Sequence, residues 1–343
     1  MGKSPPWVMK VRSAEVAQHL SIVDEVILRH VDWTELLDIA VGRHPFATKG
    51  GSIFGGSTRN SRAGDQEDEQ EKAEDERDTV KAAIDRFNTT CQWVQSQVLI
   101  VEDSTLRSKV IEKFIKIAAK CEAYRNYCTL MAIVVALQSI NISRLTRTWA
   151  RISTERKSLL DRLIHLTSPT RNFIELRNAM ESAPGVPFAG VYFSDLLFNN
   201  EIPSTVNIKS GTSSSATSET DEETRTSTSI TRSSHSAAVA SRAILDFEGD
   251  IVTVVNWQKY KVIAKVVRRF KSFLDSASYD AQYKWALRDD VFWHAVYIDR
   301  QVLEADELTR RSYAYEPSQR AGAQGGSSGT ATPTASSSAI RSP

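Results

Sequence analysis

Apolar side chains recur every three or four residues along most of this chain, which is the spacing of one face of an α-helix. The first run spans Val11–Gly42, where Ser13 is a plausible N-cap and Asp32 or Thr34 could cap a second helix. A longer run extends from Val80 to about residue 101. No segment shows the strict alternation of a β-strand, so the pattern predicts an all-helical protein.

Further helical patterns follow in series. Ser104–Cys121 is amphipathic, with Ser104 as its expected cap, whereas Asn126–Ile140 is apolar on nearly every side and is expected to be a central helix. After a short link, Ser153–Leu166 is amphipathic again. The Ser-Pro pair that opens Ser168–Met180 suits an N-cap and a first helical position, leading into a helix over residues 172–180.

Pro187–Pro203, which reads PFAGVYFSDLLFNNEIP, carries more apolar surface than one buried face needs. Val191, Phe193 and Leu197 have the spacing to face a core, and the other large side chains would then point elsewhere. The stretch is either a short core helix or a helix whose second face meets a partner.

Order is expected to return at Ile251, with a long helix from Val254 to about residue 276 and another helical stretch over about 281–309. Other segments have no periodic pattern: 17 of the 27 residues in Ser210–Ser236 are Ser or Thr. We expect one helical domain over residues 11–318, with a flexible N-terminus at 1–10, disordered insertions at about 47–78 and 204–242, and a disordered tail at 319–343.

Composition excludes several classes of function. The 343 residues carry a formal charge of +1, so no basic excess suggests nucleic acid, and no apolar run reaches transmembrane length. The N-terminus lacks the apolar core of a secretory signal, and a myristoylation motif starting at Gly2 lacks Ser or Thr at the sixth position. Cys91, Cys121 and Cys128 have no metal-type spacing and are expected to be small apolar residues in a reducing compartment.

Motifs for covalent chemistry are missing from the sequence. The six histidines are scattered without an HExxH spacing, and GGSIFGG lacks the strand and lysine of a phosphate-binding loop. We therefore expect no metal and no cofactor. A helical protein without a nucleophile or nucleotide loop is expected to act on another macromolecule by binding it.

Five blocks of the sequence resemble, in the same order, the catalytic domain of Ras guanine-nucleotide exchange factors. They are RFNTTCQWV (Arg86–Val94), Arg107–Trp149, SPTRNFIELR (Ser168–Arg177), VPFAGVYFSDLLFNNE (Val186–Glu201) and VVNWQKYKVIAKVV (Val254–Val267), and SYAYEP (Ser312–Pro317) matches the end of the family's domain. The resemblance implies an all-helical bowl that binds the switch regions of a Ras-like GTPase, with a protruding helical hairpin that opens its nucleotide site.

By this resemblance, Pro187–Pro203 contains the first helix of that hairpin. Leu197 matches the leucine that intrudes on the magnesium site of the GTPase, and Glu201 matches the acidic residue that competes for the phosphate donors. No covalent step is implied. The expected partner is a Ras-like GTPase, nucleotide-free or GDP-bound, met in the cytoplasm or by peripheral recruitment to the inner face of the plasma membrane.

Other matched positions are implied to bind the GTPase: Phe87, Asn88, Asn126, Asn172 and Arg177. For several residues a structural role is an open alternative. Asn126 suits a helix N-cap, Phe87 and Arg177 could support their blocks, and Trp93 and Trp149 suit the core. The lysines of the helix after Ser104 suit a solvated face, and Asn256 and Trp257 are expected to pack at the hairpin base.

The chain departs from the family pattern near the hairpin. Ile202 replaces a glycine after the hairpin glutamate, and a long Ser/Thr-rich insertion separates the two hairpin helices. The separate helical module that usually braces the hairpin is not in this sequence, so either the hairpin is mobile or the chain is a fragment. One rival interpretation is an inactive scaffold that keeps the bowl, and another is a membrane-docking module, for which the sequence has no polybasic patch.

Overall fold

The computed structural model describes residues 5–48, 78–209, 251–275, 279 and 283–317. Within these ranges the protein is all-α except for one two-stranded ribbon, which confirms the predicted fold class. The helices are α1 (Ser13–Arg29), α2 (Trp33–Ala40), α3 (Pro45–Thr48), α5 (Thr79–Leu99), α6 (Ser104–Ala123), α7 (Tyr127–Gln138), α8 (Ile140–Ser143), α9 (Thr146–Ala150), α10 (Thr154–Leu166), α11 (Thr170–Glu181), α12 (Gly190–Asn200), α13 (Trp257–Leu274), α15 (Asp289–Val296) and α16 (Ala305–Tyr315), with 3₁₀ turns at η1 (Trp7–Met9) and η3 (Ile298–Gln301).

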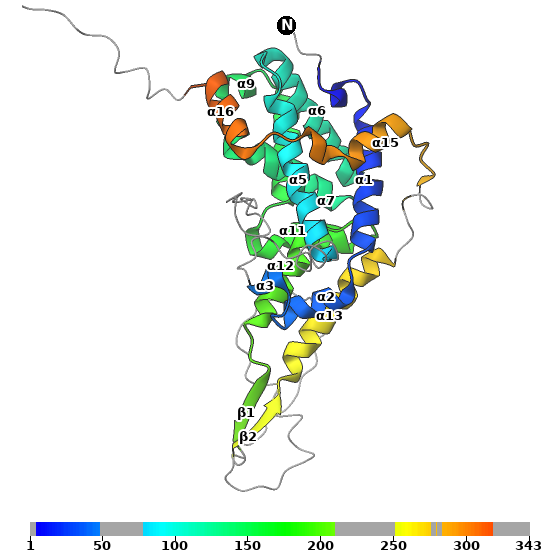
Figure 1. Cartoon of the computed structure of the whole chain (residues 1–343), viewed down its shortest axis with the longest axis vertical. Helices are drawn as coiled ribbons and strands as arrows, with labels where there is room; N and C mark the ends of the chain where they lie inside the picture. The colour runs from blue at the N-terminus through cyan, green and yellow to red at the C-terminus, as the bar shows by residue number, and fades with distance from the viewer. Residues whose placement is uncertain (1–4, 49–77, 210–250, 276–278, 280–282, 318–343) are drawn as a thin grey trace, which may run out of the picture.

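The core of the body forms around α7, with α1, α5 and α6 packed against it (Figure 1). Leu130 and Ile133 are completely buried, because α7 has neighbours on most sides. This confirms the central helix that its uniform apolar sequence predicts. No helix among the described residues is long and apolar enough to cross a bilayer.

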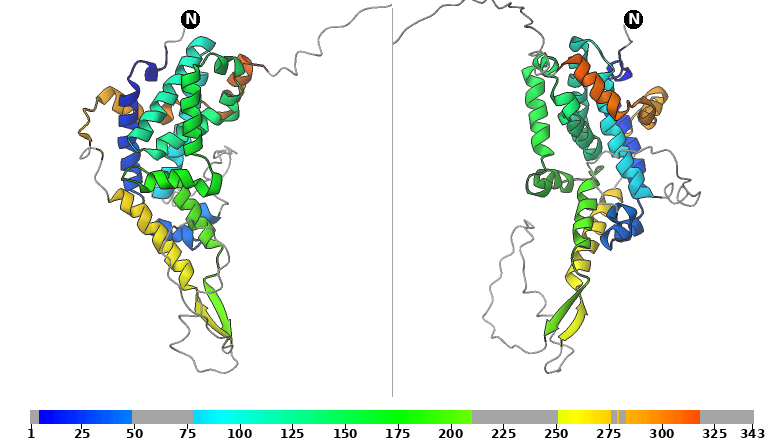
Figure 2. Two further views of the ribbon diagram at one scale, coloured as in Figure 1. Left: turned by 180° about the vertical axis from the view of Figure 1, so that it is seen from behind. Right: turned by 60° about the vertical axis from the view of Figure 1, so that its left-hand side comes forward.

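A helical hairpin of α12 and α13 protrudes from one end of this body (Figure 1). Beyond it the chain continues into an antiparallel ribbon of β1 (Thr205–Lys209) and β2 (Ile251–Val255), in which Thr205 pairs with Val255 and Lys209 with Ile251. In the right-hand view of Figure 2, α11 lies across the lower end of α10 and above the hairpin. The element that follows Glu201 along the chain is thus the strand β1.

The ribbon corrects two expectations. Residues 205–209 were expected to be disordered, and residues 254–255 to begin a helix, but both belong to strands. Each strand has only five residues, and the pairing joins partners more than 40 positions apart, so no local pattern predicts it. The rest of the Ser/Thr-rich segment, residues 210–250, lies outside the described residues.

Three more boundaries differ from the expectation. Residues 7–9 are not a free N-terminus, since Val8 is fully buried and Trp7 stacks on His294 with ring centroids 4.7 Å apart. Ala47 lies in α3 and Asp78 caps α5, whereas residues 49–77 and the tail from 318 are outside the described residues. The stretch over 281–309 is broken into α15, η3 and the start of α16.

Acidic residues take several of the N-cap positions. Asp103 rather than Ser104 accepts from a backbone amide at the start of α6, and Arg12 rather than Ser13 precedes α1. Of the two candidate caps for the second helix, Asp32 is confirmed, and Ser153 caps α10 by accepting from the Arg156 amide. The short link over residues 144–149 contains the single turn of α9.

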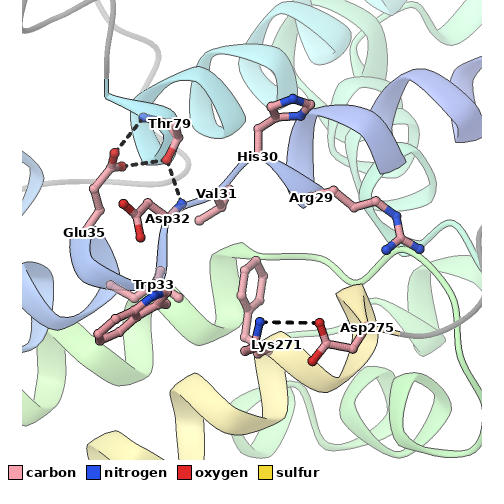
Figure 3. A pocket seen from close by; sticks show the side chains of 11 residues that line it. Arg29, His30, Val31, Asp32, Trp33, Glu35, Thr79, Lys271 and Asp275 are labelled. Atoms are coloured by element: carbon pink, nitrogen blue, oxygen red, sulfur yellow. Dashed lines mark hydrogen bonds and ion pairs between the residues drawn. The ribbon is translucent and has the colours of Figure 1, made fainter.

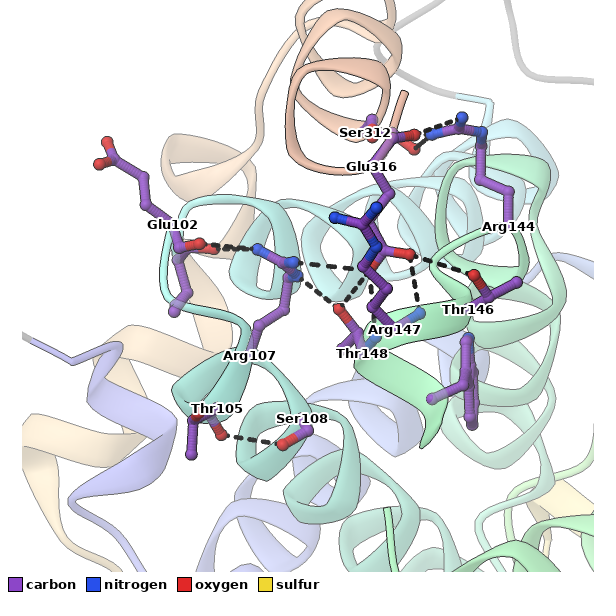
Figure 4. A network of polar contacts seen from close by, with 12 residues as sticks. Glu102, Thr105, Arg107, Ser108, Arg144, Thr146, Arg147, Thr148, Ser312 and Glu316 are labelled. Carbon is purple, nitrogen blue, oxygen red and sulfur yellow. Dashed lines mark hydrogen bonds and ion pairs between the residues drawn. The ribbon is translucent and has the colours of Figure 1, made fainter. Parts of the chain in front are cut away.

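The C-terminal helix is fastened to the body by a buried carboxylate (Figure 4). Glu316 accepts hydrogen bonds from the amides of Arg147 and Thr148 at 2.8 and 3.0 Å and from the Thr148 hydroxyl at 2.8 Å. The buried guanidinium of Arg107 lies 3.7 Å away and donates to Thr148. This network ties the end of the domain to the turn between α8 and α10.

All three cysteines are buried thiols with no disulfide partner among the described residues. Burial raises the pKa of Cys91, Cys121 and Cys128, so the thiols stay protonated at neutral pH. They therefore serve as small apolar core residues, as predicted.

Candidate functional site

Helix α12 turns one face into the protein and keeps another toward solvent. Val191, Phe193 and Leu196 are at most 1% exposed, and the Phe193 ring lies 6.1 Å from that of Phe270 on α13. Phe198 on the opposite side is 53% exposed. Of the three residues expected to face the core, Val191 and Phe193 are buried, and Leu197 is only half-buried at its edge.

Leu197 and Glu201 lie one helical turn apart at the outer end of α12. Glu201 is the C-cap residue and is exposed, and its carboxylate has neither a hydrogen bond nor an ion pair with any described residue. An apolar side chain and an unpaired carboxylate are thus presented together on the protruding hairpin.

The outer end of the hairpin is closed by a buried lysine. Lys259 is 4% exposed, and its Nζ donates to the carbonyl of Ile202 at 2.7 Å and lies 3.5 Å from that of Asn200. A cation at the C-terminus of a helix satisfies carbonyls that have no partner within the helix. Asn256, the N-cap of α13, donates to the carbonyl of Pro203 at the outer end of the hairpin and not at the expected base, and Trp257 is 68% exposed. Ile202 stands where the family has a glycine, and in this chain the carbonyls at the C-terminus of α12 are capped by Lys259.

The body supports α12 through the turn after α2. Gly42 has a φ of +75°, and a Cβ at this position would lie 2.8 Å from the Asn200 side-chain amide. Phe46 in α3 meets the edge of Phe193, with centroids 6.4 Å apart. Only glycine allows this turn to approach the end of the hairpin helix so closely.

On the other side, Arg177 of α11 contacts α12. Its Nη1 and Nη2 donate to Asp195 at 2.8 and 2.9 Å, and its Nε donates to the carbonyl of Asn172 at 2.8 Å. Nη2 also lies within hydrogen-bond distance of the Asn172 side-chain oxygen and the Val191 carbonyl. The start of α11 differs from the regular Ser-Pro start that was expected, because residues 171–173 adopt left-handed backbone angles.

The other predicted GTPase contacts fall into two groups. Asn172 is exposed and Asn88 half-buried, so both have surface to offer a partner. Phe87 is 4% exposed, with its ring 5.1 Å from Phe188, and Asn126 is completely buried. Asn126 caps α7 by accepting from Thr129, as the alternative interpretation had it, and it donates to Asp24 at 2.9 Å.

The tryptophans and lysines considered for other roles follow the structural alternatives. Trp93 is completely buried and meets Phe114 edge to face, and Trp149 is partly buried. The lysines of α6 are exposed or half-buried along its outer face.

A cavity of about 500 Å³ lies between α13 and the junction of α1 with α2 (Figure 3). Its charged groups are already engaged: Glu35 accepts from Thr79 and Val80, and Lys271 pairs with Asp275 at 3.4 Å. Because its polar groups satisfy one another, the cavity does not have the convergent donors and acceptors of a cofactor site.

Glu35, His44 and Asp78 form a cluster that the sequence does not reveal, because they are far apart along the chain. His44 Nδ1 accepts from the Phe46 amide at 3.1 Å, so the ring proton belongs on Nε2, which lies 3.3 Å from Asp78. A metal on Nε2 would have to displace that proton, and Glu35 is already occupied by amides of α5. The cluster joins the turn after α2 to the start of α5.

Two residues that shape the site were not among the predicted ones. Asp195 appears in the sequence only as a polar interruption of an apolar stretch, and Lys259 as one of several lysines in α13. A charged residue on the apolar face of an amphipathic helix is a signal that could have singled out Lys259.

The chain is similar to known proteins over most of its helical body. The family model described as RasGEF domain matches residues 15–261. The chain is 30% identical over 201 residues to guanine nucleotide exchange factor LTE1 of Saccharomyces cerevisiae, covering 57% of this chain and 13% of that protein. It is 27% identical over 209 residues to Ras-specific guanine nucleotide-releasing factor RalGPS1 of Danio rerio, covering 60% of this chain and 34% of that protein.

The LTE1 protein of Kluyveromyces lactis is 29% identical over 57% of this chain, which corresponds to 14% of that protein. The matched region is thus a small part of the length of these relatives. The region that the family model matches, residues 15–261, contains α12 and most of the body and reaches into α13. The chain belongs to the RasGEF domain family.

Proposed function

We propose that this chain is a guanine-nucleotide exchange factor that binds a Ras-like small GTPase and promotes release of GDP so that GTP can bind. The observation that carries the proposal is the pairing of half-buried Leu197 with unpartnered Glu201 on the protruding hairpin. Family membership and the names of the matched relatives support it.

The mechanism requires no covalent chemistry. A GTPase holds GDP through Mg²⁺, a lysine and backbone amides around its phosphates. Leu197 would occupy the metal position with an apolar group, and Glu201 would compete for the phosphate donors. Both effects weaken GDP binding, and by linkage GDP weakens binding of the exchange factor to the same extent.

The favoured partner state is therefore the nucleotide-free GTPase, with the GDP-bound form as the initial target. Asn88 and Asn172 are the predicted positions with the most surface for its switch regions. The chain would meet the GTPase in the cytoplasm or, after peripheral recruitment, at the plasma membrane, where lipid-anchored GTPases lie.

Fluorescent-GDP release from GTPases of the Ras, Rap and Ral types tests this function. We expect the unchanged chain to accelerate release from at least one of them, and Leu197→Ala or Glu201→Ala to slow it about tenfold each, a loss of about 1.4 kcal/mol. Glu155→Ala, at an exposed carboxylate on α10, is the matched control and should leave the rate unchanged.

The absence of acceleration across the whole panel would contradict the proposal. Formation of a stable complex with a GTPase, without faster release, would instead favour the inactive scaffold.

A further inference from the structure

The guanidinium of Arg177 forms hydrogen bonds within the protein through each of its nitrogens. All three of its nitrogens donate hydrogen bonds, to Asp195 and Val191 on α12 and to Asn172 at the start of α11. Its side chain is only 15% exposed. A guanidinium in this state has little left to offer a GTPase, although the sequence match places it among the binding positions.

Arg177 also stabilises an unfavourable backbone. Arg171, Asn172 and Phe173 have φ values of 52°, 56° and 58°. Residues other than glycine rarely adopt this left-handed backbone conformation in succession. The bond from Arg177 Nε to the Asn172 carbonyl fixes the middle of this turn. The turn presents the exposed Asn172 side chain, so its conformation determines where that candidate contact points.

The same guanidinium therefore connects two parts of the site. One edge holds the turn at Asn172, and the other holds Asp195, which precedes Leu197 by two residues on α12. The Arg177–Asp195 pair is bidentate and mostly shielded from solvent, which is the strong form of such a contact. By contrast, the ion pair between Arg269 of α13 and Glu181 of α11 is 39% and 40% exposed and is expected to contribute little.

We propose that Arg177 is a positioning residue for nucleotide exchange: it makes the turn at Asn172 and the hairpin helix α12 move as one unit. This inference rests on the proposed exchange function. Binding of a GTPase at Asn172 would then set the angle at which Leu197 and Glu201 approach the nucleotide. The residue acts through these groups and does not touch the nucleotide itself.

The test separates rate from affinity. Release of fluorescent GDP is followed at increasing concentrations of the chain, giving a maximal rate and a half-saturating concentration. Arg177→Ala should lower the maximal rate about tenfold while the half-saturating concentration changes less than about threefold. Arg177→Lys should be almost as slow, because an ammonium keeps the charge but cannot form the two-pronged bond.

A double-mutant cycle identifies the route. If Arg177 acts through the hairpin, adding Arg177→Ala to Leu197→Ala should slow release less than about twofold further. Arg162→Ala is the matched control, because Arg162 makes a bidentate pair with Glu122 at 2.6 and 2.7 Å between α10 and α6, neither of which belongs to the hairpin. It should retain the full maximal rate.

Hydrogen exchange tests the coupling without any GTPase. In Arg177→Ala, amides of α12 and of residues 171–173 should exchange about tenfold faster, with α5 and α7 unchanged. An unchanged maximal rate in Arg177→Ala, or full rescue by Arg177→Lys, would overturn the positioning role. If the unchanged chain does not accelerate GDP release from any GTPase, the proposed function fails, and the role of Arg177 in exchange fails with it. The hydrogen-exchange result then still decides whether Arg177 couples the turn at Asn172 to α12.

Discussion

At the scale of single residues, the buried carboxylate of Glu316 is held by several hydrogen bonds. Burial alone would raise the pKa of Glu316, but the donors from Arg147 and Thr148 and the charge of Arg107 outweigh it and lower the pKa below its ordinary value. A carboxyl group whose pKa is lower in the folded state stabilises the fold above its unfolded pKa. That contribution disappears as the pH falls through the folded value.

Glu316→Gln should therefore destabilise the protein by about 2 kcal/mol at pH 7, because a neutral amide accepts more weakly from the same donors. The difference between variant and unchanged chain should shrink as the pH falls below the ordinary pKa of a glutamate and through the lowered pKa of Glu316. Urea unfolding at pH 7 and at two acidic values measures it. Glu175→Gln, at an exposed position of α11, should change little; a pH-independent loss at Glu316 would contradict the ionic explanation.

At the scale of elements, α12 is held from three directions. The turn after α2 packs against Asn200, Arg177 ties its middle to α11, and Lys259 closes its C-terminus against α13. The last contact is closest to Glu201, so it bears most directly on where that carboxylate is presented.

Lys259→Met keeps the apolar stem but removes the donor to the carbonyls of Ile202 and Asn200. We expect a loss of about 1 kcal/mol in stability and faster hydrogen exchange at the last turn of α12, since a helix C-terminus loses its cation. GDP release should slow as Glu201 becomes less ordered. Lys261→Met, at an exposed position of the same helix, is the control, and equal effects of the two variants would rule out the capping role.

At the scale of the whole molecule, the hairpin and its ribbon form an extension of a packed helical body (Figure 2). The ribbon closes through the pair Lys209 and Ile251, so the connection between these residues need not contribute to the core. The chain length between them affects stability mainly through the entropy of loop closure.

Deletion of Ser210–Ser236 should therefore leave the fold intact, with a stability change of about 1 kcal/mol or less. Thermal unfolding should show a Tm within about 4 °C of the unchanged chain. A deletion of the same length over residues 205–231 removes β1 as well, and should slow GDP release more, because the ribbon no longer aligns the ends of α12 and α13. Unfolding of the first variant would contradict the prediction.

The sequence by itself determined the helical class, the central helix α7 and the family, because helical periodicity is local and the matching blocks occur in order. It also marked Leu197 and Glu201 by their positions in one block. Tertiary structure alone decided the β1–β2 ribbon, the burial of Asn126 and Phe87, and the left-handed turn at Asn172. The ribbon and the burial of Asn126 depend on partners distant along the chain, such as Asp24 for Asn126, so no local pattern could show which matched residues face a partner and which hold the site together.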